Sequence, residues 1–342
     1  MNKKAIVFTF IVVSLLSIVL IAFLLNLATK NSQSKLQETN VKVETINSFV
    51  KTVNTQLIPQ ALKSSSNRVV LSWLHHLNKT NVGLKNRGSG KFIVSNTNLN
   101  TELKDALVDA HYREGVTLYY LDYMNETDNG LVINYTLPSI LNEIRDVAGD
   151  SGINFQYDNP ATYTYAITQI SPWEIKVEIS NVGYRLNDTR NEISWVFSGR
   201  SFATILNVTN YNEPMMLVFN EREVTINKTQ ITDFSNINNL VSFYSRPEYR
   251  EHSDAPSFLN RLQGNFTPDV NGIETVLEPN PAYFPNPSGY SNVDFEYWGY
   301  VDGCEVDDPG SPGSYISNLY LTTPHLASYI RTHDSLPNCP VT

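Results

Sequence analysis

Histidine side chains are the first candidates for chemistry in this chain, because imidazole binds metal ions and transfers protons near neutral pH. Adjacent His75 and His76 cannot both face one side of a helix. No pair of histidines shows the His-Glu-x-x-His spacing of zinc hydrolases. The histidine positions therefore predict no metal site. The six histidines are His75, His76, His111, His252, His325 and His333.

Motifs for other catalytic chemistry are missing from the sequence. It contains no Gly-x-Ser-x-Gly nucleophile elbow, no Walker loop and no dinucleotide fingerprint. We therefore predict a protein that is not an enzyme and has no cofactor. A catalytic triad can be assembled from residues distant in sequence, which leave no such motif. An exported hydrolase without a recognisable motif is therefore kept as the less favoured alternative.

The only two cysteines are Cys304 and Cys339, close to the C-terminal end of the sequence. An exported pair of this kind most simply forms one disulfide. By closing the loop between Cys304 and Cys339, such a disulfide would contribute about 3–4 kcal/mol to stability. A metal site would need further ligands at usable spacing, and a nucleophilic cysteine would need a neighbouring base. We therefore predict a disulfide between Cys304 and Cys339.

An acidic segment near Cys304 matches a calcium-binding loop only in part. Asp302, Glu305, Asp307 and Asp308 lie in a stretch rich in glycine and proline. Carboxylates on a bent loop can bind calcium, but the spacing differs from that of an EF-hand. A solvated acidic turn is the favoured interpretation, and calcium binding is the alternative.

The overall charge is acidic, with 25 Lys and Arg residues against 34 Asp and Glu residues and a formal net charge of −9. Nucleic-acid binding requires a basic surface, so this balance predicts no nucleic-acid partner. We interpret the acidic surface as a means of keeping the protein soluble.

The N-terminal segment predicts membrane insertion. Residues 5–29 carry no charged side chain and are mostly apolar. Such a run is long enough to span a bilayer and longer than the apolar part of a cleaved signal peptide. Lys3 and Lys4 precede it, and positive residues stay in the cytoplasm. We therefore expect a signal-anchor transmembrane helix over 1–29, in contact with the membrane through 5–27. The N-terminus would be cytoplasmic and the bulk extracytoplasmic.

The basic head Asn2-Lys3-Lys4-Ala5, followed directly by this apolar helix, resembles the class III signal of type IV pilins and related archaeal surface proteins. In that family a dedicated peptidase cuts between the basic head and the apolar helix. The resemblance implies a component of a surface filament, and it places the cleavage point at Lys4–Ala5. Whether that bond is cut is left open.

A helical stalk is expected over residues 30–66. Apolar residues recur there at intervals of seven, three and four, which is the spacing of a heptad seam. Either a single amphipathic helix or self-association through 36–57 satisfies this pattern. Pro59 is expected to kink or end the helix. The seam residues are Leu36, Val43, Ile46, Val50, Val53 and Leu57.

Residues 67–231 mix helical and strand patterns and predict an α+β ectodomain. Helices are expected at 100–113 and 138–148, the second with Pro138 in its first turn. In 162–170, and again in 174–179 after Ser171 and Pro172, apolar residues alternate with polar ones, as in half-exposed antiparallel strands. Hairpins are expected at 193–208, turning at Gly199, and at 215–226. The predicted sheet is an antiparallel meander.

Residues 232–342 form the last predicted region, rich in proline and closed by the disulfide. Strands are expected at 293–301 and 315–321. A helix is expected from Thr323 to Arg331, with Pro324 in its first turn.

Seven asparagines lie in Asn-x-Ser/Thr sequons, a number close to chance for this composition. An extracytoplasmic position would permit their glycosylation. The glycosylation candidates are Asn78, Asn125, Asn134, Asn187, Asn207, Asn227 and Asn265.

Together these features predict a membrane-anchored structural or interaction protein, including a pilin-like filament component as one form. The alternative is an anchored adhesin or glycan-binding ectodomain. Its partner or glycan is not predicted.

Overall fold

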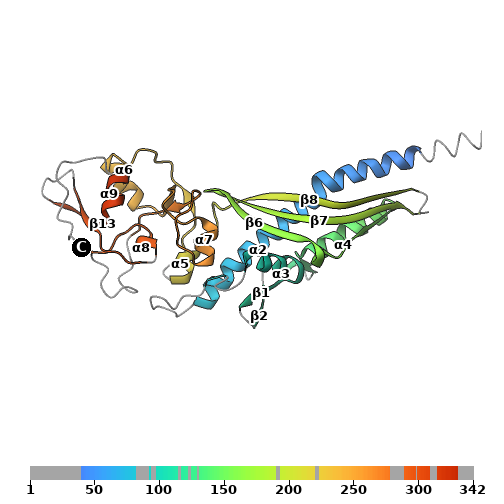
Figure 1. Cartoon of the computed structure of the whole chain (residues 1–342), viewed down its shortest axis with the longest axis horizontal. Coiled ribbons are helices and arrows are strands. Elements are labelled where there is room, and N and C mark those ends of the chain that lie inside the picture. Colours follow the sequence, from blue (N-terminus) through green and yellow to red (C-terminus); the bar gives the residue numbers. More distant parts are fainter. Residues whose placement is uncertain are drawn as a thin grey trace, which may run out of the picture. The chain divides into compact units, whose positions relative to one another are not determined.

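The computed structural model describes most of the chain from residue 40 onward (Figure 1). Its contacts divide the chain into two compact units. Unit 1 holds the described residues up to Leu57 together with Ile144–Gln156 and Tyr184–Phe197, and unit 2 holds the rest. The described residues are 40–81, 92–93, 98–114, 117–121, 125–128, 131–189, 193–219, 223–277, 289–297, 299–308 and 314–329.

The first described element is a helix over residues 40–52, followed by the π-helical turn η1 (Val53–Leu57) and by α2 (Ile58–Asn81). Ile46 and Val53 of the predicted seam are buried. Pro59 lies just after the π-helical turn η1, inside a continuous run of helical residues from 40 to 81. Helical residues lie on both sides of Pro59, so the helix end predicted there is not seen.

No helix in the part of the chain that the structure describes is long and apolar enough to cross a membrane. The predicted signal-anchor helix over 1–29 falls on residues outside that part. This finding corrects the predicted fold class, keywords and localisation: the described chain is α+β with antiparallel sheets and no spanning helix. The predicted single-pass membrane protein is therefore not supported.

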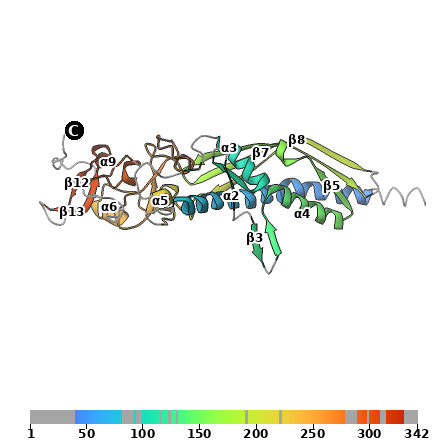
Figure 2. The same cartoon turned by 90° about the horizontal axis from the view of Figure 1, so that it is seen from below.

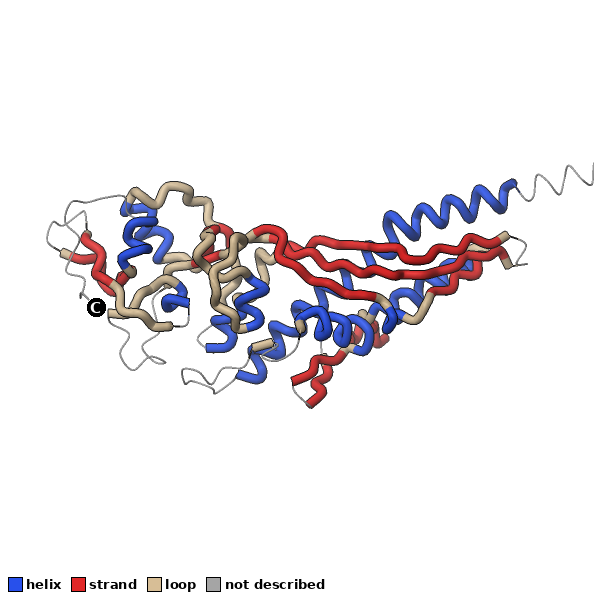
Figure 3. The backbone as a smooth tube through the Cα atoms, viewed as in Figure 1, coloured by secondary structure: helices blue, strands red, loops and turns tan. Residues whose placement is uncertain are grey.

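The largest sheet has the strand order β5-β7-β6, with β8 also paired to β7; Figure 3 shows β6, β7 and β8 as long red strands. In β6 and β7, Tyr165 faces Ile179 and Ile167 faces Val177 in antiparallel register. These four side chains are buried, as the alternation in the sequence predicts. The strands are β5 (Ile153–Tyr157), β6 (Thr164–Ser171), β7 (Glu174–Asp188) and β8 (Ser194–Asn207).

Two predicted hairpins are wrong. β8 runs through Gly199 as one strand, and Gly199 takes a positive φ of 61° within the strand instead of turning the chain. Residues 215–219 are expected to be a strand, but they belong to the helix α5 (Pro214–Phe219). A helix forms there because Pro214 suits a first turn and Glu213 accepts a hydrogen bond from the Met216 N–H at 2.6 Å.

Two helices, a short 3₁₀ turn and two small hairpins complete the described middle of the chain (Figures 1 and 2). The predicted helix at 138–148 is confirmed as α4, and the one at 100–113 is confirmed as α3 up to Asp109, whereas 111–113 belong to the strand β1. Asn98 is the N-cap of α3. The elements are α3 (Leu99–Asp109), β1 (His111–Glu114), β2 (Thr117–Tyr120), β3 (Asn125–Asp128), β4 (Leu131–Asn134), α4 (Leu137–Asp150) and the 3₁₀ turn η3 (Pro160–Thr162).

The C-terminal part of unit 2 consists of short elements. One small sheet has the order β11-β10-β9, and β12 pairs with β13. The elements are β9 (Asn227–Lys228), α6 (Ile237–Tyr244), β10 (Glu248–Glu251), α7 (Phe258–Gln263), β11 (Ile273–Glu274), α8 (Asp294–Tyr297), β12 (Cys304–Asp307), β13 (Tyr315–Leu321) and α9 (Thr323–Tyr329).

The strand predicted at 293–301 is wrong, because Asp294 begins the turn α8. The Asp294 N–H donates to the Thr275 carbonyl at 3.0 Å, and its carboxylate accepts from the Thr275 N–H at 2.9 Å. These two hydrogen bonds between Asp294 and Thr275 divert the chain out of an extended path.

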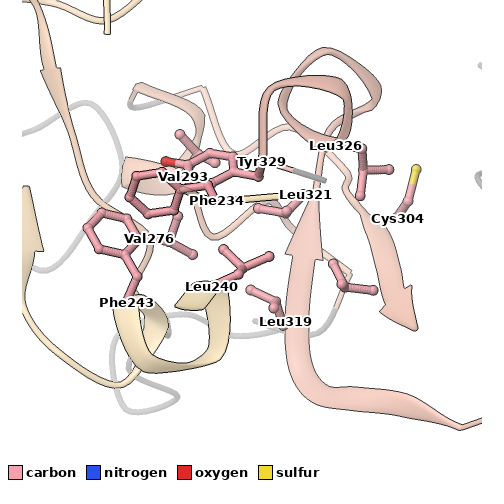
Figure 4. Packing of buried hydrophobic residues seen from close by; sticks show 11 residues of the cluster. Phe234, Leu240, Phe243, Val276, Val293, Cys304, Leu319, Leu321, Leu326 and Tyr329 are labelled. Carbon is pink, nitrogen blue, oxygen red and sulfur yellow. The ribbon is translucent and has the colours of Figure 1, made fainter. Parts of the chain in front are cut away.

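A hydrophobic cluster packs these short elements together (Figure 4). Phe234, Phe243 and Tyr329 form edge-on and tilted ring contacts with centroids 5.0–6.3 Å apart. Tyr329 is fully buried, and its hydroxyl group reaches out of the cluster to the carboxylate of Glu274. The cluster therefore provides the rigid base of the polar site described next.

Candidate metal centre

Glu274 is the centre of the most connected polar cluster in the described part of the chain. It lies on β11, directly opposite Arg250 of β10, and its side chain is fully buried. Arg250 donates to Oε1 through Nε at 2.8 Å and through Nη2 at 2.5 Å. Tyr329 donates to the same oxygen at 2.9 Å, whereas Tyr297 donates to Oε2. One carboxylate oxygen is thus saturated, and the other keeps a free lone pair.

Two imidazole nitrogens face that second oxygen. His252 Nδ1 and His325 Nε2 each lie 3.4 Å from Glu274 Oε2. Both nitrogens are buried, and neither makes a hydrogen bond. All three ligand atoms lie within 4.8 Å of one another. This is the one group of three or more potential ligands within reach of a single ion among the described residues.

Two of the three separations between ligand atoms fit coordination by a small divalent ion. Zinc binds imidazole nitrogen and carboxylate oxygen at about 2.0–2.2 Å, so neighbouring ligand atoms of a tetrahedron lie about 3.3–3.5 Å apart. The separations of Glu274 Oε2 from His252 Nδ1 and from His325 Nε2 match this edge. Because Arg250 and Tyr329 occupy Oε1, Glu274 would bind through Oε2 alone.

Different elements position the two histidines. His252 follows β10 in a turn whose N–H donates to the Gly272 carbonyl at 3.0 Å. A Cβ atom at Gly272 would lie 2.3 Å from the His252 carbonyl and 2.0 Å from that of Ala255. Only glycine therefore permits this close approach. His325 lies in the first turn of α9, where its Nδ1 is 2.8 Å from the Thr322 hydroxyl.

The turn α8 brings further polar side chains to the cluster. Its residues Asp294, Phe295, Glu296 and Tyr297 have φ values of 37°, 53°, 43° and 45°. A left-handed backbone costs about 1–2 kcal/mol per non-glycine residue. Successive residues of this strained turn serve different partners: Asp294 pairs with Arg261, Glu296 lies near His325, and Tyr297 binds Glu274. Strain of this kind is typical of functional sites.

The electrostatic environment favours the metal-binding forms of Glu274 and His252, whereas His325 would release a proton on binding. Burial raises the pKa of Glu274, but His325 and the charge of Arg250 outweigh burial and hold this pKa well below its ordinary range. Burial lowers the pKa of His252 below 6.5, against the opposing effect of Glu274. Burial also acts to lower the pKa of His325, but its contact with Glu274 raises it overall. An ionised Glu274 and a neutral His252 are the forms that bind metals.

A second buried cluster surrounds Arg261 of α7, which is fully buried. Its Nη1 donates to Glu213 at 3.2 Å and its Nη2 pairs with Asp294. Its remaining donors reach the carbonyls of Pro256 and Ile273. Burial, with a smaller contribution from the charge of Glu213, raises the pKa of Asp294 to about 7 in spite of Arg261.

Cys304, the first predicted site residue, lies at the start of β12 and is disulfide-bonded. Cys339 lies outside the described residues, so the pairing of Cys304 with Cys339 stays a prediction. Of the acidic segment, Glu305 and Asp307 lie on the strand β12 and are exposed. The calcium alternative gains no support from this extended strand.

The predicted glycosylation candidates differ in exposure. Asn207, Asn227 and Asn265 are exposed, Asn78 and Asn134 are half-buried, and Asn187 is buried on β7. Asn125 lies on β3. Exposure does not test whether a sequon is glycosylated, and nothing in the structure supports the predicted glycoprotein character.

The cluster of His252, Glu274 and His325 could not be found from spacing. The three residues come from the end of a short strand, from a two-residue strand and from a helix after β13. The prediction of no metal site was based on the spacing of ligands close in sequence. Residues as far apart as these three leave no such spacing.

Comparison with protein-family models, with curated proteins and with solved structures returns no match. The resemblance to class III pilin signals depends on residues 2–5 and the helix after them, which lie outside the described residues, and it stays a prediction.

Thr322, His325 and Glu274 also stand in the order hydroxyl, imidazole, carboxylate that hydrolases use. A nucleophile must reach substrate, yet Thr322 is only 8% exposed. Its hydroxyl is also 3.5 Å from Glu296 Oε1. This burial favours positioning of His325 over nucleophilic attack.

Proposed function

We propose that this protein is a structural or interaction protein whose C-terminal part binds one divalent transition-metal ion. His252 Nδ1, Glu274 Oε2 and His325 Nε2 are the proposed ligands, and water takes the fourth position. The observation that carries this proposal is the convergence of two buried, unbonded imidazole nitrogens on one carboxylate oxygen. Two imidazoles and a carboxylate suit zinc, so zinc is the proposed ion.

The proposed ion would join three segments of the chain. Its ligands come from the turn after β10, from β11 and from α9. An ion that binds only the native state stabilises it, by about 2.7 kcal/mol at a free concentration of 100 times Kd. The proposed role of the ion is therefore to hold α9 against the β10–β11 pair. The net charge of −9 supports a partner other than nucleic acid.

The test is metal binding by the full chain after treatment with a chelator and exchange into metal-free buffer. We expect one equivalent of Zn²⁺ to bind, as measured by elemental analysis and by competition with a chromogenic chelator. His252→Ala and His325→Ala should each abolish stoichiometric binding. His75→Ala is the matched control, because His75 lies on α2 and is half-buried.

Wild-type protein that takes up no Zn²⁺, or a His75→Ala variant that loses Zn²⁺ together with the two cluster variants, would contradict the proposal. Since catalytic zinc also keeps an open position, the metal-loaded protein is the form in which the alternative hydrolase activity should be sought.

A further inference from the structure

The face of His325 opposite the proposed ion carries a second polar chain. Its Nδ1 lies 2.8 Å from Thr322 Oγ1 and 3.4 Å from Glu296 Oε1. The Thr322 hydroxyl in turn lies 3.5 Å from Glu296 Oε1, to which it donates. Thr322 is buried and the Glu296 side chain is only 17% exposed, so water competes little with these contacts.

The direction of these bonds follows from proton counting. A threonine hydroxyl has one proton and can accept through its lone pairs. The Glu296 carboxylate, 3.4 Å from Nδ1, favours the tautomer that carries its proton on Nδ1, in which Thr322 accepts from Nδ1 and donates to Glu296. The ring then holds its proton on Nδ1 and directs the Nε2 lone pair at the position that faces Glu274 Oε2.

We infer that Glu296 and Thr322 are positioning residues, which fix the tautomer and orientation of His325 so that Nε2 binds the metal ion. This inference rests on the proposed metal site. It also gives the left-handed turn α8 a purpose, because Glu296, with a φ of 43°, reaches His325 from within that turn. A carboxylate that holds the far nitrogen of a metal-bound imidazole is a recurrent arrangement in metalloproteins.

The affinity test compares four variants of the full chain in the Zn²⁺ competition assay. Thr322→Val removes the hydroxyl with little change of shape, and Glu296→Gln removes the charge. Each should weaken Zn²⁺ binding about 10- to 100-fold. Thr322→Ser keeps the hydroxyl and should bind like the wild type. Thr204→Val is the matched control, since Thr204 and Thr322 are both 8% exposed.

A spectroscopic test separates positioning from general stability. In the Co²⁺-loaded protein, the ring N–H proton of His325 should appear as a shifted NMR signal that disappears in D₂O. We expect this proton to exchange slowly with solvent in the wild type and in Thr322→Ser. It should exchange at least about tenfold faster in Thr322→Val and Glu296→Gln, because its acceptor chain is broken.

The outcomes distinguish this inference from the proposed function. A wild type that binds no metal overturns both. A wild type that binds Zn²⁺, with unchanged affinity and exchange in Glu296→Gln and Thr322→Val, overturns the positioning role alone. If Thr322→Val does not fold, as judged by circular dichroism, Glu296→Gln and Thr322→Ser still decide the question.

Discussion

The two buried charge clusters of unit 2 contain similar groups but arrange them in opposite ways. In one, Arg261 is central, and carboxylates and carbonyls engage its guanidinium donors on every side. In the other, Glu274 is central, and Arg250 and two tyrosines bind it while two imidazole nitrogens near it lack hydrogen bonds. Both centres are fully buried.

This difference separates a structural cluster from a candidate site. A buried charge is tolerated when partners compensate it, and such compensation by itself indicates no function. Buried nitrogen lone pairs without a donor carry a free-energy cost that a bound ion would remove. The donors of Arg261 are therefore all engaged, whereas the Glu274 cluster keeps two nitrogens that make no hydrogen bond. Three predictions test that contrast, beginning with the largest effect.

Removing the central cation of the Arg261 cluster should give the largest loss of stability. Arg261→Met would leave the buried carboxylates of Glu213 and Asp294 without their partner. We expect the free energy of unfolding in urea to fall by about 3–5 kcal/mol. Arg246→Met is the control, because the Arg246 side chain is 62% exposed and should change stability by less than about 0.5 kcal/mol. Equal losses of unfolding free energy in both variants would contradict a special role of the buried Arg261.

The same cluster predicts a pH dependence, measured with a chelator present. The folded pKa of Asp294, about 7, lies above its ordinary value of 3.8, so the native state binds an extra proton between these values. The resulting stability is fully present below about pH 4 and is lost as pH rises through 7.

Glu213→Gln removes the charge that helps to raise the pKa of Asp294. The loss of unfolding free energy between pH 4 and pH 7 should therefore shrink by about 1–2 kcal/mol relative to wild type. The variant also disturbs the bond from the Met216 N–H, so the pH slope is the readout and absolute stability is not. Identical slopes, measured by urea unfolding at several pH values, would show that Asp294 is not the titrating group.

The smallest effect is expected at an exposed ion pair close in sequence to the site. Lys228 Nζ lies 3.3 Å from Glu251 Oε1, with side chains 50% and 56% exposed. Lys228→Ala should lower stability by less than about 1 kcal/mol and leave Zn²⁺ affinity unchanged. A larger loss in thermal unfolding, or altered metal affinity, would mean that surface charge contributes to the site.

The sequence patterns predicted the elements whose burial is periodic. Tyr165 and Ile167 of β6, with Ile175 and Val177 of β7, alternate with polar residues, and this period of two is sufficient to define a strand. Patterning did not predict α5 or α8. Capping by Glu213 decides the first, and the bonds of Asp294 to Thr275 decide the second. Both depend on side chains that a hydrophobic pattern does not include.

The sequence by itself determined the acidic surface, the α+β character and the alternating strands, because composition and local periodicity act over a few neighbouring residues. Only the tertiary structure decided that His252, Glu274 and His325 meet. Their meeting depends on the pairing of β10 with β11, on the close approach at Gly272 and on the packing of α9 against the aromatic cluster. Long-range packing sets these distances, so no local pattern carries them.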